Sequence, residues 1–242
     1  QHTLGIDAGA DIAARGNQVA IFWGAGDLSR EYERTVFTRL SGDFGETFGA
    51  ELQIGNPDLG ACGCCSLAGD FIDDDSLLVA YRSALAGVGR HMQMLTAQGL
   101  SDGISNAYYG ETHKLQQWEA SFCPLSTNDI SADSDDQLWL VFETQSRIVQ
   151  LEFAEGVVPT SVAEPFTETR QKNPAIAING SNQRLVVWAE AISHSRGGRL
   201  NMRLFTADSS APEVVLSEEI NLDDFSFPAA TTLSNGGFLV VY

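Results

Sequence analysis

Five short apolar segments recur along the chain, and each of them ends in an aromatic residue. They are rich in β-branched and aromatic side chains and occupy residues 19–23, 77–81, 138–142, 185–188 and 238–242. Continuous apolar runs of this length predict buried strands. Their first residues lie 47 to 61 positions apart, so one structural unit recurs at an irregular spacing.

Each apolar segment is preceded by another short strand pattern and a polar turn, which predicts a hairpin at the start of every repeat. The turns contain Asn, Asp and Gly, which tolerate the positive φ angles of tight hairpins. The first strands are expected at 11–14, 66–69, 129–132, 175–178 and 229–233. Third strands are expected at 35–40, 91–96, 148–153 and 200–205, and weaker fourth strands at 50–54 and 213–217. Only residues 112–119 indicate a short helical turn.

Four antiparallel strands per repeat predict an all-β fold, a β-propeller of four-stranded antiparallel blades with about five repeats. The alternative is a β-sandwich, which would show turn signals without a repeating four-strand unit. We expect a single domain over residues 1–242. Because the last repeat stops within its second strand, its edge would be open. We therefore expect further chain beyond Tyr242, or a partner subunit that covers this edge.

The charge of the chain restricts its partners. There are 14 Lys and Arg against 32 Asp and Glu, which gives a formal net charge of −18. Nucleic acids and anionic membranes attract basic surfaces, so neither is expected as a partner. No apolar run approaches the roughly 18 residues of a membrane span, so we expect no membrane insertion. With 43% hydrophobic residues, the chain can still build a sizeable core.

Residues 41–48 read Ser-Gly-Asp-Phe-Gly-Glu-Thr-Phe and fall between a predicted third and fourth strand. The Ser and Asp side chains can bond nearby backbone N–H groups, Gly supplies a permissive backbone, and the final Phe is expected to plug the blade. The segment resembles the Asp-box of bacterial neuraminidase repeats, whose role is structural. The matching positions are Ser41, Asp43, Gly45, Thr47 and Phe48.

A second resemblance involves the cysteines. A Cys-x-Cys-Cys cluster starts at Cys62, a Tyr-Arg pair follows at Tyr81, and Trp118 precedes a Cys-Pro element at Cys123. This arrangement resembles a group of secreted bacterial sialidase-like repeat proteins. Together the two resemblances span about residues 10–145. They imply a periplasmic or extracellular location and a sialidase-like propeller.

The catalytic set that the sialidase resemblance implies is not recognisable in the sequence. A sialidase uses three arginines to clamp a carboxylate, a Tyr nucleophile activated by Glu, and an Asp acid. Residues 1–30 lack the family's Arg-Ile-Pro element. Tyr81 is expected to pack between blades and Glu190 to lie at the rim. Further candidates outside a sialidase context are Tyr108, Tyr109, Arg15, Arg30, Arg34, Arg82, Arg147, Arg170 and Arg203.

Two acidic runs lie in predicted hairpin turns, where solvated polar loops are expected. Their carboxylates are also candidates for the acid and base of a different glycosidase. Ca²⁺ binding is a further alternative, although neither run has the spacing of a calcium loop. The residues are Asp73, Asp74, Asp75, Asp133, Asp135 and Asp136.

The cysteines are the sharpest chemical feature. Aligning the repeats places Cys123 beside Cys62, Cys64 and Cys65, on the innermost strand of the next blade. A vicinal bridge would be strained, so the expected disulfide joins Cys64 or Cys65 to Cys123. The alternative is a thiolate site for Cu or Zn.

Two histidines are possible additional ligands for such a metal. They are His91 and His113, of which His91 is expected on a strand edge. The Cys-x-Cys-Cys spacing differs from the Cys-x2-Cys pairs of structural zinc sites.

Three functions follow from these features. The first is a secreted or periplasmic, non-catalytic binding or assembly module, whose partner is a protein or a glycan and which is a possible subunit of a larger assembly. The second is a glycoside hydrolase of the exo-sialidase-like kind. The third is a copper- or zinc-handling protein that uses the cysteines.

Overall fold

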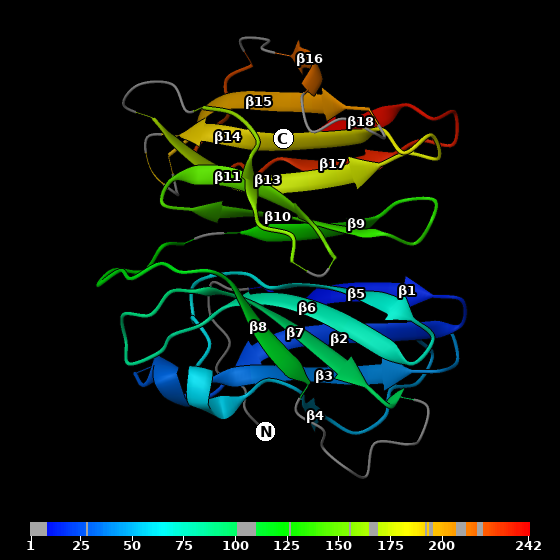
Figure 1. Cartoon of the computed structure of the whole chain (residues 1–242), viewed down its shortest axis with the longest axis vertical. Helices are drawn as coiled ribbons and strands as arrows, with labels where there is room; N and C mark the ends of the chain where they lie inside the picture. The colour runs from blue at the N-terminus through cyan, green and yellow to red at the C-terminus, as the bar shows by residue number, and fades with distance from the viewer. Residues whose placement is uncertain are drawn as a thin grey trace. The chain divides into compact units, whose positions relative to one another are not determined.

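The computed structural model describes the chain except residues 1–8, 28, 101–109, 126, 155, 165–168, 192, 194–195, 207–211 and 217–219, and for 212–216 it gives the backbone only. The described residues form two compact units, Gln1–Leu125 and Ser126–Tyr242. Each unit consists almost entirely of antiparallel sheets (Figure 1). None of the helices within the described ranges has the length and apolar character needed to cross a membrane.

The first unit contains two four-stranded sheets. Their strand orders are β1-β2-β3-β4 and β5-β6-β7-β8, so each sheet is a simple meander. Short 3₁₀ helices η1 (Glu31–Glu33) and η2 (Pro57–Leu59) lie in the connections. The strands are β1 (Asp11–Arg15), β2 (Gln18–Ala25), β3 (Thr35–Ser41), β4 (Leu52–Gln53), β5 (Ala68–Asp73), β6 (Ser76–Arg82), β7 (Met92–Gln98) and β8 (Glu111–Gln116).

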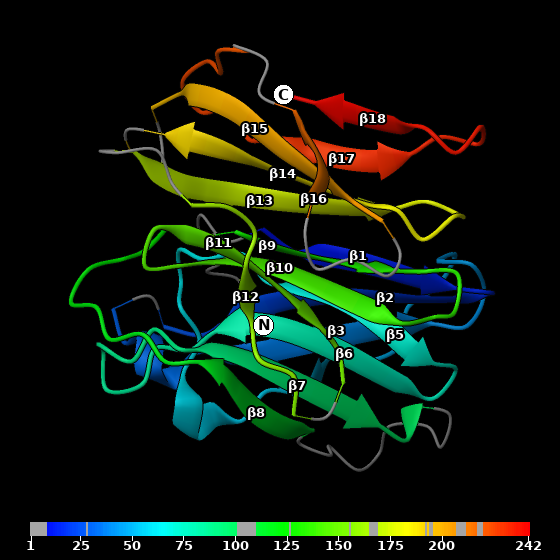
Figure 2. The same cartoon turned by 45° about the horizontal axis from the view of Figure 1, so that its top comes forward.

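The second unit contains two four-stranded sheets and one two-stranded sheet. The orders are β12-β11-β10-β9, β13-β14-β15-β16 and β17-β18. Figure 2 shows these strands from a second direction. The strands are β9 (Asn128–Ala132), β10 (Leu138–Thr144), β11 (Arg147–Glu152), β12 (Thr160–Ser161), β13 (Arg170–Ile178), β14 (Arg184–Ala191), β15 (Gly198–Phe205), β16 (Pro212–Leu216), β17 (Ala229–Thr232) and β18 (Phe238–Val241).

The predicted strands are confirmed, whereas the predicted helical turn is not. All five apolar segments are second strands, and each pairs with a first strand through a hairpin. The helical turn expected at 112–119 is wrong, because residues 111–116 form β8 and pair with β7. The described fold is therefore nearly all-β, built from four-stranded antiparallel sheets.

The first strands of successive sheets lie side by side within each unit, which is the arrangement of neighbouring propeller blades. Strand β1 lies beside β5, while β13 lies between β9 and β17. The Asp11 carboxylate accepts a hydrogen bond from the Gly69 N–H at 2.8 Å. Asp129, at the corresponding place in the other unit, accepts from the Ile176 N–H at 2.9 Å. The same Asp contact thus joins neighbouring first strands twice.

The core of the first unit lies between its two sheets. It includes Phe22, Leu77 and Val79, all fully shielded from solvent. Gly69 on β5 allows the Phe22 ring to approach the backbone, since a Cβ atom at Gly69 would lie 2.7 Å from two ring carbons. The close approach of sheet and ring therefore depends on a residue without a side chain.

Replacing Gly69 by alanine is expected to lower the free energy of unfolding by about 1–3 kcal/mol, because the overpacked ring has no exposed space to enter. Urea unfolding measures this loss. Gly42→Ala is the matched control, since no atom lies within 4 Å of its added Cβ. Equal stability of the two variants would contradict the tight packing of Phe22 on β5.

Two apolar clusters stabilise the second unit. One lies between the β9–β12 and β13–β16 sheets and contains Val141, Val186 and the fully buried Trp188. The other contains Leu185 and Leu200 and packs against half-buried residues of β17 and β18. Alternate residues of β14 thus face different neighbours, as expected for a strand inside a stack of sheets.

Ser41 is the last residue of β3, and residues 42–48 follow it in the connection between the third and fourth strands, as predicted. The Asp43 carboxylate accepts from the Thr47 N–H at 2.9 Å and from the Thr47 hydroxyl at 2.6 Å. The Ser41 hydroxyl donates to Asp43 at 2.6 Å and accepts from the Gly45 N–H at 2.9 Å. Gly45 has a φ of 84°, which glycine adopts without strain. Phe48 is half-buried and lies outside the core cluster of its unit, contrary to its expected place as a plug.

The hydrogen bonds from Ser41 and Thr47 lower the pKa of Asp43 to about 2 from the usual 3.8. A lowered pKa favours the folded state above pH 3.8, and this contribution is lost as the pH falls toward 2. Carboxyl carbon chemical shifts measured against pH should therefore show Asp43 titrating near 2. In the Ser41→Ala variant the pKa of Asp43 is expected to rise, because one of its hydrogen bonds is lost. Titration of native Asp43 at or above its ordinary value would disprove the hydrogen-bonded turn.

Candidate functional site

Buried charged side chains gather in each unit around the ends of second strands and the starts of the following first strands. In the second unit they are Glu143 near the end of β10, Lys172 near the start of β13, and Glu190 near the end of β14. Their exposed fractions are 0%, 4% and 4%. Ionised groups are seldom buried to this degree without specific partners.

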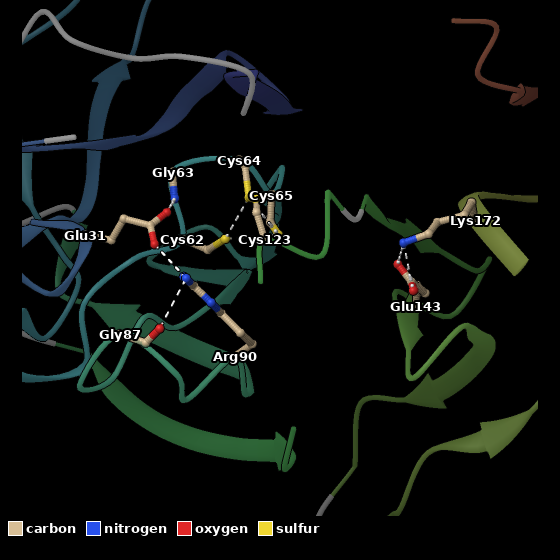
Figure 3. The surroundings of a disulfide bond; sticks show 10 residues. All are labelled: Glu31, Cys62, Gly63, Cys64, Cys65, Gly87, Arg90, Cys123, Glu143 and Lys172. Carbon is tan, nitrogen blue, oxygen red and sulfur yellow. Dashed lines mark hydrogen bonds and ion pairs between the residues drawn. A yellow bond between two sulfur atoms is a disulfide. The ribbon is translucent and has the colours of Figure 1, made fainter. Parts of the chain in front are cut away.

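Glu143 and Lys172 form a buried ion pair. The Lys172 ammonium group donates to both carboxylate oxygens of Glu143, at 3.0 and 2.9 Å (Figure 3). The Ser146 N–H also donates to this carboxylate, at 3.3 Å. The pair joins two sheets of the second unit, because Glu143 belongs to β10 and Lys172 to β13.

A bulge in β13 follows Lys172 directly. The register between β13 and β14 shifts between Lys172 and Ala175. Asn173 has a φ of 53°, which asparagine tolerates better than most residues, and Pro174 has no N–H to donate to the ladder. Bulges alter the direction of neighbouring side chains, so this Asn-Pro pair is the local cause of the lysine's placement.

Glu190 is held by three uncharged donors. Its Oε1 accepts from the Gln171 amide at 3.0 Å and from the Trp188 indole at 3.2 Å, and its Oε2 accepts from the Thr169 hydroxyl at 2.6 Å. Gln171 lies directly opposite Glu190 across the β13–β14 pair. The expectation that Glu190 lies at the rim is wrong, because three neighbouring side chains provide the hydrogen bonds that allow its burial.

The second unit therefore contains two buried carboxylates in different surroundings. Glu143 faces a cation, while Glu190 accepts hydrogen bonds from neutral groups. Gln171 and Lys172, which hold them, are consecutive residues of β13. Carboxylates in contrasting environments are suited to different roles in acid and base chemistry.

The four cysteines gather in the first unit (Figure 3). Cys64 and Cys123 form a disulfide, with a Cα–Cα distance of 6.5 Å. Cys62 and Cys65 are free and buried. The Cys62 Sγ lies 3.3 Å from the Cys64 Sγ and 3.1 Å from the Cys65 Sγ. The structure thus contains one of the two expected pairings.

The expected placement of Cys123 on an innermost strand is wrong. Cys123 lies in the connection between β8 and β9, and β9 begins only at Asn128. Pro124 follows Cys123 and lacks the N–H that a strand ladder needs. The other three cysteines lie in the connection between η2 and β5, so two loops bring the sulfurs together.

An ion pair borders the cysteine loop. Arg90 Nη2 lies 2.7 Å from Glu31 Oε2, and Glu31 Oε1 accepts from the Gly63 N–H at 2.9 Å. The hydrogen bond with Cys65 lowers the pKa of the Cys62 thiol from 9.0 to about 7, and the charge of Arg90 acts in the same direction against the effect of burial. Cys62 therefore has more thiolate character than an ordinary cysteine.

The structure does not bring the two histidines into the cysteine cluster. Among the described residues, the one group of three or more ligand-type side chains whose atoms lie within 4.8 Å of one another is Cys62, Cys64 and Cys65. His91 lies just before β7, and its Nδ1 is 3.1 Å from the Trp118 backbone nitrogen. His113 lies exposed on β8, and its Nε2 is 3.4 Å from Glu111.

The acidic runs lie in hairpin turns, as predicted, and their side chains stabilise these turns. The Asp133 carboxylate accepts from the N–H groups of Asp135 and Gln137, both at 2.9 Å. Asp73 accepts from the Asp75 N–H at 2.8 Å. Neither run belongs to a convergent group of ligands within the described ranges.

Tyr81, Arg34 and Arg82 contact the core or the backbone of the protein itself. Tyr81 belongs to the apolar core of the first unit, and burial raises its pKa, which disfavours a phenolate nucleophile. Arg34 donates to the carbonyls of Gly24 and Gly26, and Arg82 donates to the carbonyl of Arg90. Tyr108 and Tyr109 lie outside the described residues.

The fold is similar to those of several carbohydrate-active enzymes. An α-L-arabinanase from Penicillium chrysogenum, solved with arabinobiose, matches with a TM-score of 0.60 and 14% identity, over 96% of this chain and 74% of its own. The GH93 α-L-arabinofuranosidase of Fusarium graminearum matches with 0.59 and 12%, over 96% and 73%. The Hadza microbial sialidase Hz136 matches with 0.57 and 11%, over 96% and 52%.

These similarities concern the fold. No protein-family profile matches the sequence, and no curated protein sequence does either. At 11–14% identity the structural matches show similarity of fold alone. The chain has a propeller-type fold similar to those of arabinanases and sialidases.

Proposed function

We propose that this protein is a glycoside hydrolase that acts on a neutral glycan. The observation that carries the proposal is the pair of buried carboxylates, Glu143 and Glu190, within the second unit. The fold is that of enzymes named as arabinanases, arabinofuranosidases and sialidases, which supports the same class of reaction. This reading is preferred to a non-catalytic binding module, which none of these structural matches supports.

Glycoside hydrolysis by most enzymes needs two carboxyl groups with distinct roles. Lys172 neutralises the charge of Glu143, which suits a residue that acts as a carboxylate nucleophile or base. Glu190 accepts its hydrogen bonds from neutral donors, with the Arg203 guanidinium group near by over the Trp188 ring, and we assign it as the proton donor to the leaving group. Trp188 is fully buried, and its indole N–H helps to fix the Glu190 carboxylate in position.

A neutral substrate fits the charges better than a sialoside does. The net charge of −18 repels anionic ligands. A sialidase-like clamp needs arginines that are free to bind a carboxylate, whereas Arg34 and Arg82 donate to backbone carbonyls and Arg90 pairs with Glu31. We therefore place arabinan-type glycans ahead of sialosides.

The experiment measures reducing-end release from arabinan, arabino-oligosaccharides and a sialyl-oligosaccharide by the purified chain. We expect release from a neutral glycan and little from the sialoside. Glu143→Gln should abolish the activity, whereas Glu164→Gln should not, because Glu164 is 79% exposed and pairs with Arg147. A folded protein that releases nothing from any of these glycans would refute the proposal.

One observation favours the binding module as a second candidate. Every oxygen of Glu143 and Glu190 accepts a hydrogen bond from the protein, as in a rigid scaffold. Calorimetry with the same glycans separates the two functions. Binding without turnover would favour the module, and turnover would exclude it.

We also propose that the protein is exported to the periplasm or the extracellular space. The Cys64–Cys123 disulfide supports this, because disulfides persist in oxidising compartments. The four-stranded sheets are proposed to be propeller blades. Mass spectrometry of non-reduced protein from fractionated cells tests the location, since cytoplasmic protein with four free thiols would contradict it.

A further inference from the structure

We propose that Cys62, Cys64, Cys65 and Cys123 form a four-thiolate site for a thiophilic d¹⁰ cation, Zn²⁺ or Cu⁺, when the Cys64–Cys123 disulfide is reduced. This site lies in the first unit and is independent of the proposed hydrolase function. The juxtaposition that carries it is the convergence of four sulfur atoms from two loops.

The distances between the sulfurs suit a single ion. The Cys62 Sγ lies 3.3 Å from the Cys64 Sγ and 3.1 Å from the Cys65 Sγ, and the Sγ atoms of Cys64 and Cys65 are 3.9 Å apart. Four sulfurs at about 2.3 Å from a tetrahedral ion lie about 3.8 Å from one another. Each of these three sulfur–sulfur distances therefore has to change by less than about 1 Å for all three sulfurs to bind one zinc ion.

The fourth ligand comes from the other loop. Cys123 is bonded to Cys64, so its sulfur already lies at the cluster (Figure 3). Three sulfurs from the loop before β5 and one from the loop after β8 give the closed four-ligand set of a structural site. The short Cys-x-Cys-Cys spacing places its ligands on one tight turn, and the long-range partner completes the set.

The surroundings of the sulfurs suit a charged thiolate cluster. Cys62 and Cys65 are 5% and 6% exposed and would shield one side of a bound ion, while Cys64 is half-buried and Cys123 is exposed. The Arg90 guanidinium group borders the same loop, where it can balance part of the negative charge of the thiolates. Glu31 fixes both Arg90 and the Gly63 N–H, which holds the loop in place. Partners that orient the ligands in this way are typical of metal centres.

The change between the two states is balanced. A dithiol reductant donates two electrons and two protons, the Cys64–Cys123 bond breaks into two thiols, and the reductant becomes a disulfide. The cation then displaces the thiol protons as it binds. Soft thiolates favour Zn²⁺ and Cu⁺ over the hard cations Mg²⁺ and Ca²⁺.

The test uses the full chain, reduced anaerobically with a dithiol and separated from the reductant. One arm titrates Co²⁺ as a spectroscopic probe for zinc, followed by Zn²⁺, and the other titrates Cu⁺ against a coloured Cu⁺ chelator. We expect one ion per chain, with thiolate-to-cobalt charge-transfer absorption. The oxidised protein, with its disulfide intact, is expected to bind more than about 100-fold more weakly, since it lacks two of the four ligands.

Variants identify the ligands. Cys62→Ser is expected to weaken metal binding more than about 100-fold. The loss of a ligand should lower the affinity more than the loss of a residue that only hydrogen-bonds to a ligand, which costs about 10- to 100-fold. Cys65→Ser is the second variant, and circular dichroism checks that both fold. His113→Ala is the control, because it removes an exposed metal-type side chain outside the cluster.

Several results would overturn the site. They are the absence of charge-transfer absorption in the reduced protein, equal binding by the oxidised protein, or unchanged binding by folded Cys62→Ser and Cys65→Ser. Glycan hydrolysis plays no part in these measurements, so the two proposals fail separately.

Discussion

Replacing Lys172 by methionine is expected to lower the free energy of unfolding by about 3–5 kcal/mol, because it leaves the Glu143 carboxylate buried without its cation. The side chains of Lys172 and Glu143 are 5% and 0% exposed, and both carboxylate oxygens bind the ammonium group. Water cannot replace that partner at such a position. Urea unfolding gives the loss, and amide hydrogen exchange in β10 and β13 assigns it to the second unit.

Two controls distinguish the buried pair from ordinary ion pairs. Arg147→Met breaks the exposed pair with Glu164, where the side chains are 47% and 79% exposed, and should cost less than about 1 kcal/mol. The double variant Lys172→Met, Glu143→Leu removes both charges and should recover most of the loss. If Lys172→Met cost no more than Arg147→Met, the buried ion pair would not exist as described.

Replacing Glu190 by glutamine is expected to lower the rate of glycan hydrolysis by about 10²- to 10⁴-fold, the range for loss of a general acid. The amide keeps the shape of the side chain but cannot deliver a proton to the leaving oxygen. The rate is measured at saturating glycan, so that weaker binding does not contribute.

Substrates with good leaving groups give a sharper test of this role. An aryl glycoside with an acidic phenol needs little protonation, so Glu190→Gln should retain more activity on it than on the natural linkage. Glu164→Gln should behave like the native protein on both substrates. Equal losses on both substrates would contradict a proton-donor role for Glu190.

Strand positions were predictable from sequence where burial leaves an apolar pattern. Strands β6, β10 and β14 are buried almost throughout, so their apolar runs are continuous. Strand β18 has the same pattern in the sequence, although its Leu239 and Val241 are exposed. Strand β8 was missed because its residues are mainly exposed or half-buried and polar, from Glu111 to Gln116. Hydrogen bonding to β7 makes it a strand, and no side-chain pattern records that pairing.

The contacts between first strands have a signal in the sequence. Asp-Ile occurs at Asp11 and again at Asp129, each in a predicted first strand. Both carboxylates accept an N–H from the next first strand. An acidic residue repeated at one position of an apolar repeat indicates a buried acceptor, since a solvated residue need not recur there.

The candidate carboxylates were only partly predictable. The sequence indicates Glu190 as a candidate but not its burial, and nothing in the pattern distinguishes Glu143, which directly follows the apolar segment that ends at Phe142. Gln171, Thr169 and Lys172, which bind them, lie 19 to 29 residues away from them along the chain. The position of Lys172 depends on a bulge at Asn173 and Pro174, which hydrophobic periodicity cannot reveal.

Part of the cysteine cluster is predictable from the spacing of the cysteines and the alignment of the repeats. Close spacing in the sequence ensures that Cys62, Cys64 and Cys65 are neighbours, and the alignment of repeats brought in Cys123. The exact pairing and the two free thiols depend on loop geometry, which no repeat pattern specifies.

The most direct test of the proposed site measures stability and hydrolysis on the same sample of Glu190→Gln. A catalytic carboxylate predicts a rate at least about 100-fold lower, with a free energy of unfolding within about 1 kcal/mol of the native value. If Glu190 has only a structural role, the variant should lose stability and keep the native rate. Loss of stability with an unchanged rate per folded molecule would contradict the assignment of Glu190 to the active centre.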